Sequence, residues 1–161
     1  MPDDSRPGVI GLISDTHGLL RPSVHTALAG VDLILHAGDV GGSDILEELR
    51  IIAPVQAVFG NTDAADDPDL QKEVIISTRG ISIHVSHGHE LGAPTPQRLL
   101  AAYPQDVLVY GHTHRQLVSR VNGRLIINPG AAGPRRFDVE PSVARLTLRN
   151  GKPEVEIVPI D

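Results

Sequence analysis

Short apolar runs, each followed by turn-forming or polar residues, alternate with longer polar segments through the first third of the chain. Such runs predict buried strands, and the longer segments between them predict helices. The expected strands are residues 8–14, 32–36 and 54–59, and the expected helices lie near residues 22–29 and 43–50. This alternating order implies parallel pairing of the strands with right-handed crossovers.

The ends of the two expected helices carry their own signals. Pro22 is suited to start the first helix, and Gly30 is suited to end it. Ser43 is the expected N-cap of the second helix, and Asp44 and Glu47 lie in its first turns, where the helix dipole favours acidic side chains.

Hairpin signals replace this alternation in the rest of the chain. They are Arg79-Gly80, Asn122-Gly123 and Asn150-Gly151, each between two β-like runs. A short helix is expected to begin at Thr95-Pro96 and to end before Pro104, with a strand at 106–110 after it. The whole pattern predicts an α/β fold: a four-layer αββα sandwich of two mixed β-sheets flanked by helices.

Composition narrows the class of protein. A chain of 161 residues fits one domain covering 1–161, and the absence of Cys excludes disulfides and thiolate metal sites. A net charge of −6 and an aromatic content of 2% argue against stable nucleic-acid binding. The first residues do not resemble a signal peptide, and no apolar run approaches the ~20 residues of a membrane helix. We therefore expect a soluble, cytoplasmic protein with no membrane association.

Six apolar runs end in a residue suited to metal binding. These residues are Asp15, Asp39, Asn61, His87, His112 and Asn128, and His17 and His114 lie two positions beyond two of them. Because the working crevice of an open α/β sheet lies beyond the carboxyl ends of its strands, we expect these side chains to converge. Imidazoles and hard oxygens together suit two borderline divalent cations. Each pair alone is weak evidence, but the joint pattern predicts a metal centre.

The motifs DTH, GD, GNTD, HGH, GHTH and NPG occur in this order between Asp15 and Gly130. In this combination they resemble the calcineurin-like metallophosphoesterase superfamily, and the small size and GNTD resemble its small prokaryotic phosphodiesterase branch. The resemblance implies the αββα sandwich, in agreement with the prediction above. It implies one metal held by Asp15, His17, Asp39 and His114, and a second held by Asp39, Asn61, His87 and His112.

The expected activity is that of a dinuclear metal-dependent phosphohydrolase, in particular a phosphodiesterase acting on a small phosphate ester. Two ions ~3.5–4 Å apart can clamp the attacking and leaving oxygens while a metal-bridging hydroxide attacks phosphorus in line. Asp39 and Asn61 are the expected catalytic residues at the metals, and Asn61 is also expected to bind the substrate. Mn²⁺ is the first choice of cofactor because mixed oxygen and nitrogen ligation suits it, with Ni²⁺, Fe²⁺, Co²⁺ and Zn²⁺ left open. The sequence leaves open whether the chain assembles into a homo-oligomer.

One position departs from the family pattern. Many members have His after the Gly-Asn pair, where it is thought to assist the leaving group, and this chain has Thr62. His89 is a candidate for a replacement catalytic acid; the alternative is a residue that hydrogen-bonds beside His87. Asp63 is a weaker candidate, because an Asp here is more typical of turn stabilisation.

Other polar residues have less specific roles. Arg135 and Arg136 can bind a substrate phosphate as forked donors, or can be solvated surface residues. His36 is expected to be a hydrogen-bonded core histidine, and Asn128 is expected to shape a turn beneath the site and position ligand residues.

Two rival functions are compatible with the pattern. The first is a non-catalytic scaffold or protein-interaction module on the same fold, as in a retromer subunit of the superfamily. Loss of metal ligands would be its sign, but His17, Asn61 and His87 are all present. The second is a mononuclear metal hydrolase that acts on another bond, which a count of metal ions per chain would distinguish.

Overall fold

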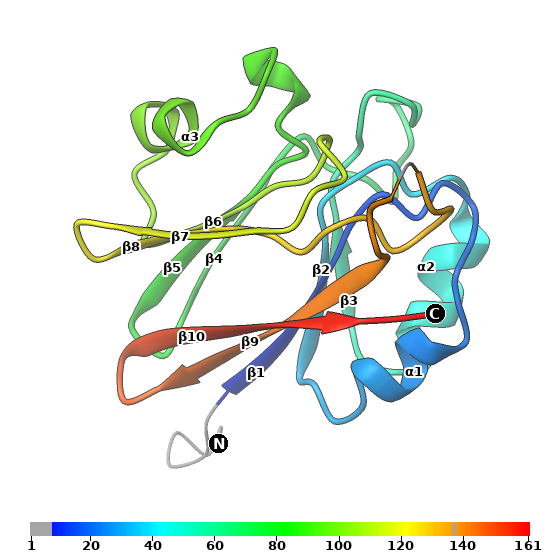
Figure 1. Ribbon diagram of the computed structural model, residues 1–161, viewed down its shortest axis with the longest axis horizontal. Helices are drawn as coiled ribbons and strands as arrows, with labels where there is room; N and C mark the ends of the chain where they lie inside the picture. The colour runs from blue at the N-terminus through cyan, green and yellow to red at the C-terminus, as the bar shows by residue number, and fades with distance from the viewer. Residues whose placement is uncertain (1–7, 137) are drawn as a thin grey trace.

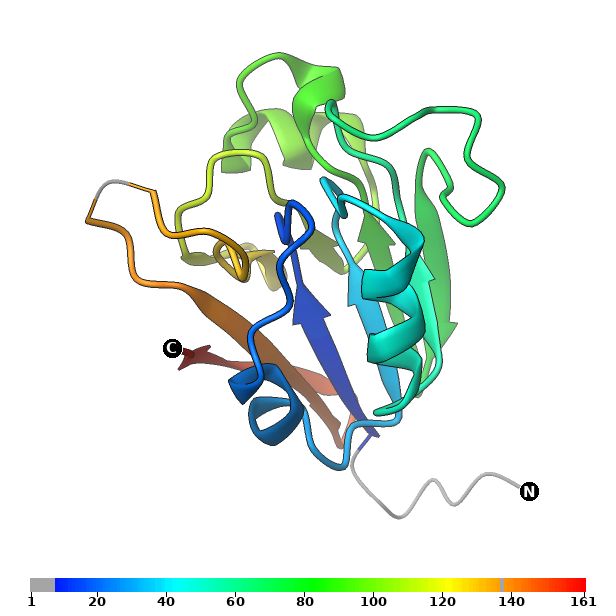
Figure 2. The same cartoon turned by 90° about the vertical axis from the view of Figure 1, so that its right-hand side faces the viewer.

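Two five-stranded sheets pack face to face in the computed structural model, which describes residues 8–136 and 138–161 (Figure 1). The strand order is β10-β9-β1-β2-β3 in the first sheet and β4-β5-β6-β8-β7 in the second. Helices α1 and α2 cover the outer face of the first sheet, and α3 covers the second (Figures 1 and 2). The predicted αββα sandwich with two mixed sheets is confirmed.

Parallel strands form the centre of the first sheet, and a hairpin completes its edge. The strands are β1 (Gly8–Ile13), β2 (Leu33–His36), β3 (Val55–Ala57), β9 (Ser142–Arg149) and β10 (Lys152–Pro159). Strands β1, β2 and β3 pair in parallel, as predicted, and β9 runs antiparallel to both β1 and β10. The C-terminal hairpin therefore returns across the molecule to lie beside β1.

The second sheet also has a parallel centre, formed by β5, β6 and β8. Its strands are β4 (Val74–Thr78), β5 (Ile81–Val85), β6 (Val107–Val109), β7 (Leu117–Val121) and β8 (Arg124–Asn128). Strands β4 and β7 pair antiparallel at the two edges. The tight turns lie at Arg79, Asn122 and Asn150, which have φ values of 51°, 49° and 54°. The three predicted hairpins are therefore confirmed.

The helices are short, and their first residues test two predictions. They are α1 (Ser23–Ala27), α2 (Ser43–Arg50), the 3-10 turn η1 (His89–Leu91) and α3 (Pro96–Ala102). The prediction that Ser43 is the N-cap of α2 is wrong: Gly42 is the cap, with φ 140° and ψ 152°. Only glycine adopts this conformation readily, so Ser43 becomes the first helical residue. Helix α3 begins as predicted, since the Thr95 side chain accepts a hydrogen bond from the Arg98 N–H.

Three layers of apolar packing hold the sandwich together. Between the sheets, Leu12 and Leu35 belong to the same fully buried cluster as Val109. Outside the first sheet, the core continues through side chains of α1 and α2, and outside the second sheet Leu99 of α3 packs on Leu108 and Ile126. Each fully buried aliphatic side chain contributes about 1.5–3 kcal/mol. Among the described residues, no helix is long and apolar enough to cross a membrane.

Candidate metal centre

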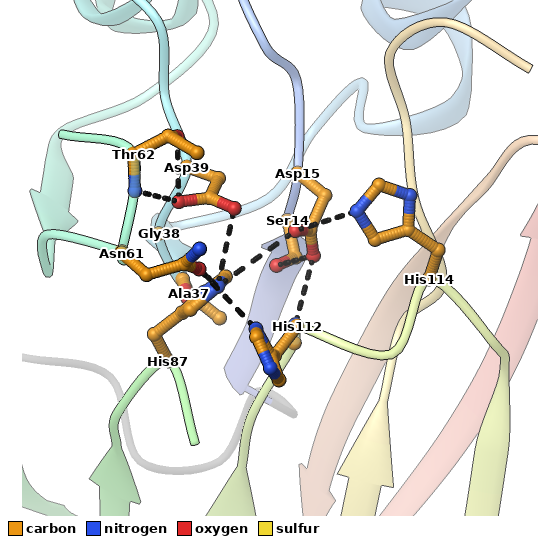
Figure 3. Close-up of polar contacts among 12 residues, drawn as sticks. Ser14, Asp15, Ala37, Gly38, Asp39, Asn61, Thr62, His87, His112 and His114 are labelled. Carbon is orange, nitrogen blue, oxygen red and sulfur yellow. Dashed lines mark hydrogen bonds and ion pairs between the residues drawn. The ribbon is translucent and has the colours of Figure 1, made fainter. Parts of the chain in front are cut away.

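The loops that follow β1, β2, β3, β5 and β6 meet at one rim of the sandwich (Figure 2). They bring together all seven predicted metal ligands: Asp15, His17, Asp39, Asn61, His87, His112 and His114. Figure 3 shows Asp39 with Asn61 and Thr62 on one side, and Asp15 with His114 on the other. The ligands therefore come from both sheets, as the strand-end pattern predicts.

Asp15, His17, Asp39 and His114 form a compact group whose candidate ligand atoms all lie within 4.8 Å of one another. His114 Nε2 lies 3.2 Å from Asp15 Oδ1. His17 Nε2 lies 3.5 Å from Asp39 Oδ2 and 3.7 Å from Asp15 Oδ1. This cluster of carboxylates and imidazoles can bind a metal ion.

Asn61, His87 and His112 converge beside this group. Asn61 Oδ1 lies 3.0 Å from His87 Nε2 and 3.2 Å from His112 Nδ1. His87 Nε2 in turn lies 3.3 Å from Asp39 Oδ2. Asp39 Oδ2 is thus close to donor atoms of both groups, as expected for a carboxylate that two cations share.

The orientation of these donors fits a cation. His87 Nδ1 donates to the Ala37 carbonyl at 2.8 Å, so a neutral imidazole presents its lone pair through Nε2. That lone pair faces the oxygens of Asn61 and Asp39. Asp15 Oδ1 is buried, and no donor within the described residues meets it in hydrogen-bond geometry. Buried lone pairs that face one another need a proton or a cation between them, and a bound cation would satisfy all of them.

The contacts described above also set the pKa values of the carboxyl groups and of His87. Burial alone would raise the pKa of both carboxyls, but His114 and His17 hold the pKa of Asp15 far below its usual value. His87 and Thr62 lower the pKa of Asp39 to about 2. Burial lowers the pKa of His87, but Asp39 and Asp15 outweigh it and raise that pKa. Both carboxylates are therefore ionised at neutral pH.

Five of the predicted ligands have left-handed backbone conformations. The φ values are 55° at Asp15, 46° at His17, 53° at Asp39, 70° at His112 and 64° at His114. Left-handed geometry costs a non-glycine residue about 1 kcal/mol or more, and such strain clusters at functional sites. Backbone hydrogen bonds hold the first two loops in this geometry, because the N–H groups of Asp15 and His17 donate to the carbonyls of Gly38 and Asp39 at 2.9 Å.

Glycines allow the loops to approach one another closely. A Cβ at Gly38 would lie 2.7 Å from His87 Nδ1, and a Cβ at Gly111 would lie 2.6 Å from Asp15 Oδ2. Only a residue without a side chain fits at either position. The glycines that precede the ligands in the sequence are therefore part of the construction of the site.

His36 supports the loop after β2 through hydrogen bonds from the buried side of the site. Its Nδ1 accepts from the Gly38 N–H at 3.0 Å, and its Nε2 donates to Thr16 Oγ1 at 3.0 Å. Thr16 in turn donates to the Val40 carbonyl at 2.7 Å. Complete burial lowers the pKa of His36 to about 4, so the ring is neutral, as this hydrogen-bond pattern requires. The geometry agrees with the predicted hydrogen-bonded core histidine.

Asp63 ties the loop after β3 to the loop after β2. Its carboxylate accepts from the N–H groups of Val40, Gly41 and Gly60 at distances of 2.9–3.2 Å. These bonds occupy both oxygens, so the geometry favours the predicted role in turn stabilisation over that of an acid.

Thr62, at the position where family members often have His, contacts Asp39. Its N–H and its hydroxyl both donate to Asp39 Oδ1, at 2.9 and 2.8 Å (Figure 3). The other oxygen, Oδ2, is left to face His17 and His87. The sequence pattern indicates only a missing acid at Thr62, because this orienting contact depends on how the two loops pack.

Two further residues fix the rim, and one of them was not predicted. Asn128 Nδ2 donates to the Gly111 carbonyl and to Thr113 Oγ1 at 3.1 and 3.0 Å, which fits its expected positioning role. Ser14 Oγ donates to Asp15 Oδ2 at 2.6 Å and has no counterpart in the predictions. The one sequence signal for this contact is that Ser14 directly precedes Asp15, the first predicted ligand.

His89 lies at the edge of the centre. Its ring centroid is 5.3 Å from that of His87 and 6.3 Å from that of His112. Within the described residues its buried Nδ1 has no hydrogen-bond partner. The expected alternative, a hydrogen bond beside His87, is not seen in this geometry.

Only one of the two predicted substrate arginines borders the centre. A cavity of about 150 Å³ is lined by His112, Thr113, His114, Arg115, Arg136 and Val139. Arg135 and Arg136 are both exposed, but Arg135 is not among the residues that line this cavity. Arg115 does, and sequence reasoning missed it although it directly follows the GHTH motif.

Comparison with known proteins agrees with this geometry. The family model described as the calcineurin-like phosphoesterase superfamily domain matches residues 9–151. A probable metallophosphoesterase of Methanothermobacter thermautotrophicus is 34% identical over 158 residues, which cover 93% of this chain and 91% of that protein. Phosphodiesterase MJ0936 of Methanocaldococcus jannaschii is 29% identical, over 75% of this chain and 82% of its own. The structure of Vps29 from Entamoeba histolytica complexed with zinc has a TM-score of 0.75 and 25% identity, covering 95% of this chain and 99% of Vps29.

Proposed function

Because the chain belongs to the calcineurin-like phosphoesterase superfamily, we propose that it is a phosphodiesterase that binds two divalent cations and hydrolyses a small phosphate ester. The observation that carries this proposal is the position of Asp39. Its Oδ2 lies 3.5 Å from His17 Nε2 and 3.3 Å from His87 Nε2, between the two groups of donors. A single carboxylate oxygen in this position can hold two cations at the short spacing that in-line displacement at phosphorus requires.

The donor set decides the charge that a substrate meets. When bound, the two ions would supply the charge that activates an attacking water and stabilises the phosphoryl oxygens. Asp15 and Asp39 contribute two negative charges, and neutral imidazoles and Asn61 contribute none. The loaded centre is therefore net positive and attracts an anionic ester despite the net charge of −6 on the chain. Mixed oxygen and nitrogen ligation makes Mn²⁺ our first choice of cation.

Asn61 and His89 have roles beside the cations in this proposal. Asn61 Oδ1 faces His87 and His112, which leaves its amide N–H groups to donate to a phosphoryl oxygen. His89 protonates the leaving group in this proposal, because its ring lies beside those of His87 and His112, whereas Thr62 is committed to Asp39. Asp63 cannot take this role, because backbone N–H groups occupy its carboxylate.

Hydrolysis of bis-p-nitrophenyl phosphate, with each of Mn²⁺, Ni²⁺, Co²⁺, Fe²⁺ and Zn²⁺ added to metal-free protein, tests the proposal. We expect turnover with at least one ion and about two ions bound per chain. The His25→Ala variant serves as the control, because His25 lies on α1, where it contacts Glu48 and no predicted ligand. This variant should keep the activity and the metal content. The absence of turnover with all five ions would overturn the proposal, and one ion per chain would favour a mononuclear hydrolase.

The scaffold alternative has one observation in its favour. The fold is shared with Vps29 of Cryptosporidium parvum, a structure described as Vacuolar Protein Sorting 29, with a TM-score of 0.79 and 25% identity over 96% of this chain and 98% of that one. The complete set of converging ligands in this chain favours the enzyme. Metal binding without hydrolysis of any diester would instead support the scaffold.

A further inference from the structure

Two arginine side chains that have no acidic partner among the described residues line the cavity beside the metal centre. It shares His112 and His114 with the centre, and Arg115 and Arg136 line it as well. Among residues 8–136 and 138–161, neither guanidinium has a hydrogen-bonding or ion-pair partner. Unpaired guanidinium groups on a concave surface are suited to binding an oxyanion.

The two arginines come from different parts of the chain. Arg115 lies between β6 and β7, and Arg136 lies between β8 and β9. The two loops lie side by side at the rim in both views (Figures 1 and 2). Their side chains therefore line one cavity because the fold brings the loops together, and not through a local run of basic residues.

Size and surroundings limit what the cavity can bind. A volume of about 150 Å³ holds an oxyanion such as a phosphate or carboxylate group. The remaining lining residues, Thr113 and Val139, carry no charge. Two acids, Asp138 and Glu140, line a neighbouring, more open hollow, which shares Arg115 and Val139 with this cavity.

We propose that Arg115 and Arg136 form a subsite for a second anionic group of the substrate, on the side of the scissile phosphate that does not leave. This inference rests on the proposed function, and it narrows the substrate class to phosphate esters that carry a further phosphate or carboxylate. Attack at phosphorus breaks the bond to the leaving alcohol, and the second anion stays with the phosphorus-containing product. Arg115 and Arg136 thus set specificity through binding and take no part in the chemical step.

A series of p-nitrophenyl alkylphosphonates tests the subsite, because all members share one leaving group. The alkyl tail ends in a phosphonate, a carboxylate or a carboxamide, and the carboxamide is the uncharged match for the carboxylate. We expect the anionic tails to lower KM roughly tenfold relative to the carboxamide, with kcat nearly constant. The R115Q/R136Q double variant should lose this preference and keep the wild-type KM for the carboxamide.

The control variant is Arg50→Gln, which removes an exposed arginine from the end of α2. It should retain the preference for anionic tails. An equal rise in KM for all tails in the double variant would mean that the arginines bind the reacting phosphoryl group, and would overturn the proposal. A preference that survives in the double variant would also overturn it. A preference for only one of the two anionic tails would identify whether the subsite binds a phosphate-like group or a carboxylate.

Calorimetric binding of the matching alkylphosphonates without the p-nitrophenyl group separates this inference from the proposed function. Tighter binding of an anionic tail than of the carboxamide, lost in R115Q/R136Q, supports the subsite even if no ester is hydrolysed. Equal binding of charged and uncharged tails overturns the subsite even if bis-p-nitrophenyl phosphate is a good substrate.

Discussion

At Asp39 the two carboxylate oxygens have different surroundings. Oδ1 accepts two hydrogen bonds from Thr62, and Oδ2 faces His17 and His87 (Figure 3). This division fixes the rotation of the carboxylate, so that one oxygen points between the two groups of donors. Loss of the whole side chain and loss of its orientation should therefore have different consequences.

Asp39→Ala should remove both metals, whereas His17→Ala should mainly weaken one. The reason is that Asp39 Oδ2 approaches donors of both groups and His17 approaches only the group of Asp15, Asp39 and His114. Metal analysis of the purified variants gives the number of ions retained per chain. Full metal content and activity in Asp39→Ala would contradict the shared position of this carboxylate.

Thr62→Val should weaken metal binding about tenfold without removing a ligand. The substitution deletes the hydroxyl that donates to Asp39 Oδ1 at 2.8 Å and keeps the backbone N–H bond. Titration with Mn²⁺ measures the change, and Thr62→Ser, which keeps the hydroxyl, is the matched control. Equal affinities for all three proteins would show that the hydroxyl does not orient the carboxylate.

His89→Gln should slow hydrolysis in proportion to the basicity of the leaving group. An acid is needed most by a poor leaving group, so p-nitrophenyl esters should be affected little and alkyl esters by about a hundredfold. Rates across a series of leaving groups give the dependence, and metal content serves as the control for an intact centre. A uniform loss across the series would assign His89 to positioning instead of proton transfer.

At the scale of elements, side chains that are not ligands join the loops after the parallel strands, in addition to the backbone hydrogen bonds between those loops. Asp63 connects the loop after β3 to the loop after β2, and Asn128 holds the loop after β6. His36 and Thr16 connect the loops after β1 and β2 from below. The geometry of the centre therefore depends on contacts between neighbouring loops as well as on the strands that carry them.

Asp63→Asn should destabilise the protein by about 1–3 kcal/mol and weaken metal binding. Asn has one acceptor oxygen, and cannot accept from Val40, Gly41 and Gly60 as the two oxygens of Asp63 do. Chemical denaturation of the metal-free protein measures the loss. Asp66→Asn, at an exposed position of the same loop, is the control and should be neutral. Unchanged stability in Asp63→Asn would show that these bonds contribute little.

The sequence predicts which segments form strands and helices better than it predicts which of them pack together. The apolar runs before Asp15 and Asp39 indicate parallel strands, because continuous burial leaves a local signature. The position of the β9–β10 hairpin beside β1 has no such signature, since an alternating strand can pair at any free edge. Convergence of the ligands was predictable from their places after strands, whereas the contacts of Thr62 and Arg115 depend on how separate loops pack.

At the scale of the whole molecule, the pH dependence of stability should include a contribution from His36. Its pKa is about 4 in the folded chain and 6.5 when unfolded. Between these pH values the unfolded chain binds a proton that the folded chain excludes. The contribution is therefore fully present above pH 6.5, and roughly 3 kcal/mol is lost as the pH falls to about 4.

Denaturation of the metal-free protein at several pH values, with His36→Gln for comparison, measures this contribution. Gln can accept from the Gly38 N–H but has no proton to gain in this range, so the difference between the two proteins should shrink as the pH falls. His87 has a raised pKa, which acts in the opposite direction, but it is present in both proteins and cancels from the comparison. Parallel stability curves would rule out this role of His36.

The left-handed residues at the rim limit how the heat resistance of this protein can be raised. Replacing Asp15, His17, Asp39, His112 or His114 by glycine would relieve an unfavourable φ at each position. A search guided by backbone geometry alone would rank these five changes highly, and each would delete a candidate metal ligand. The most attractive targets for stabilisation are thus the ones that must be left untouched if activity is to survive.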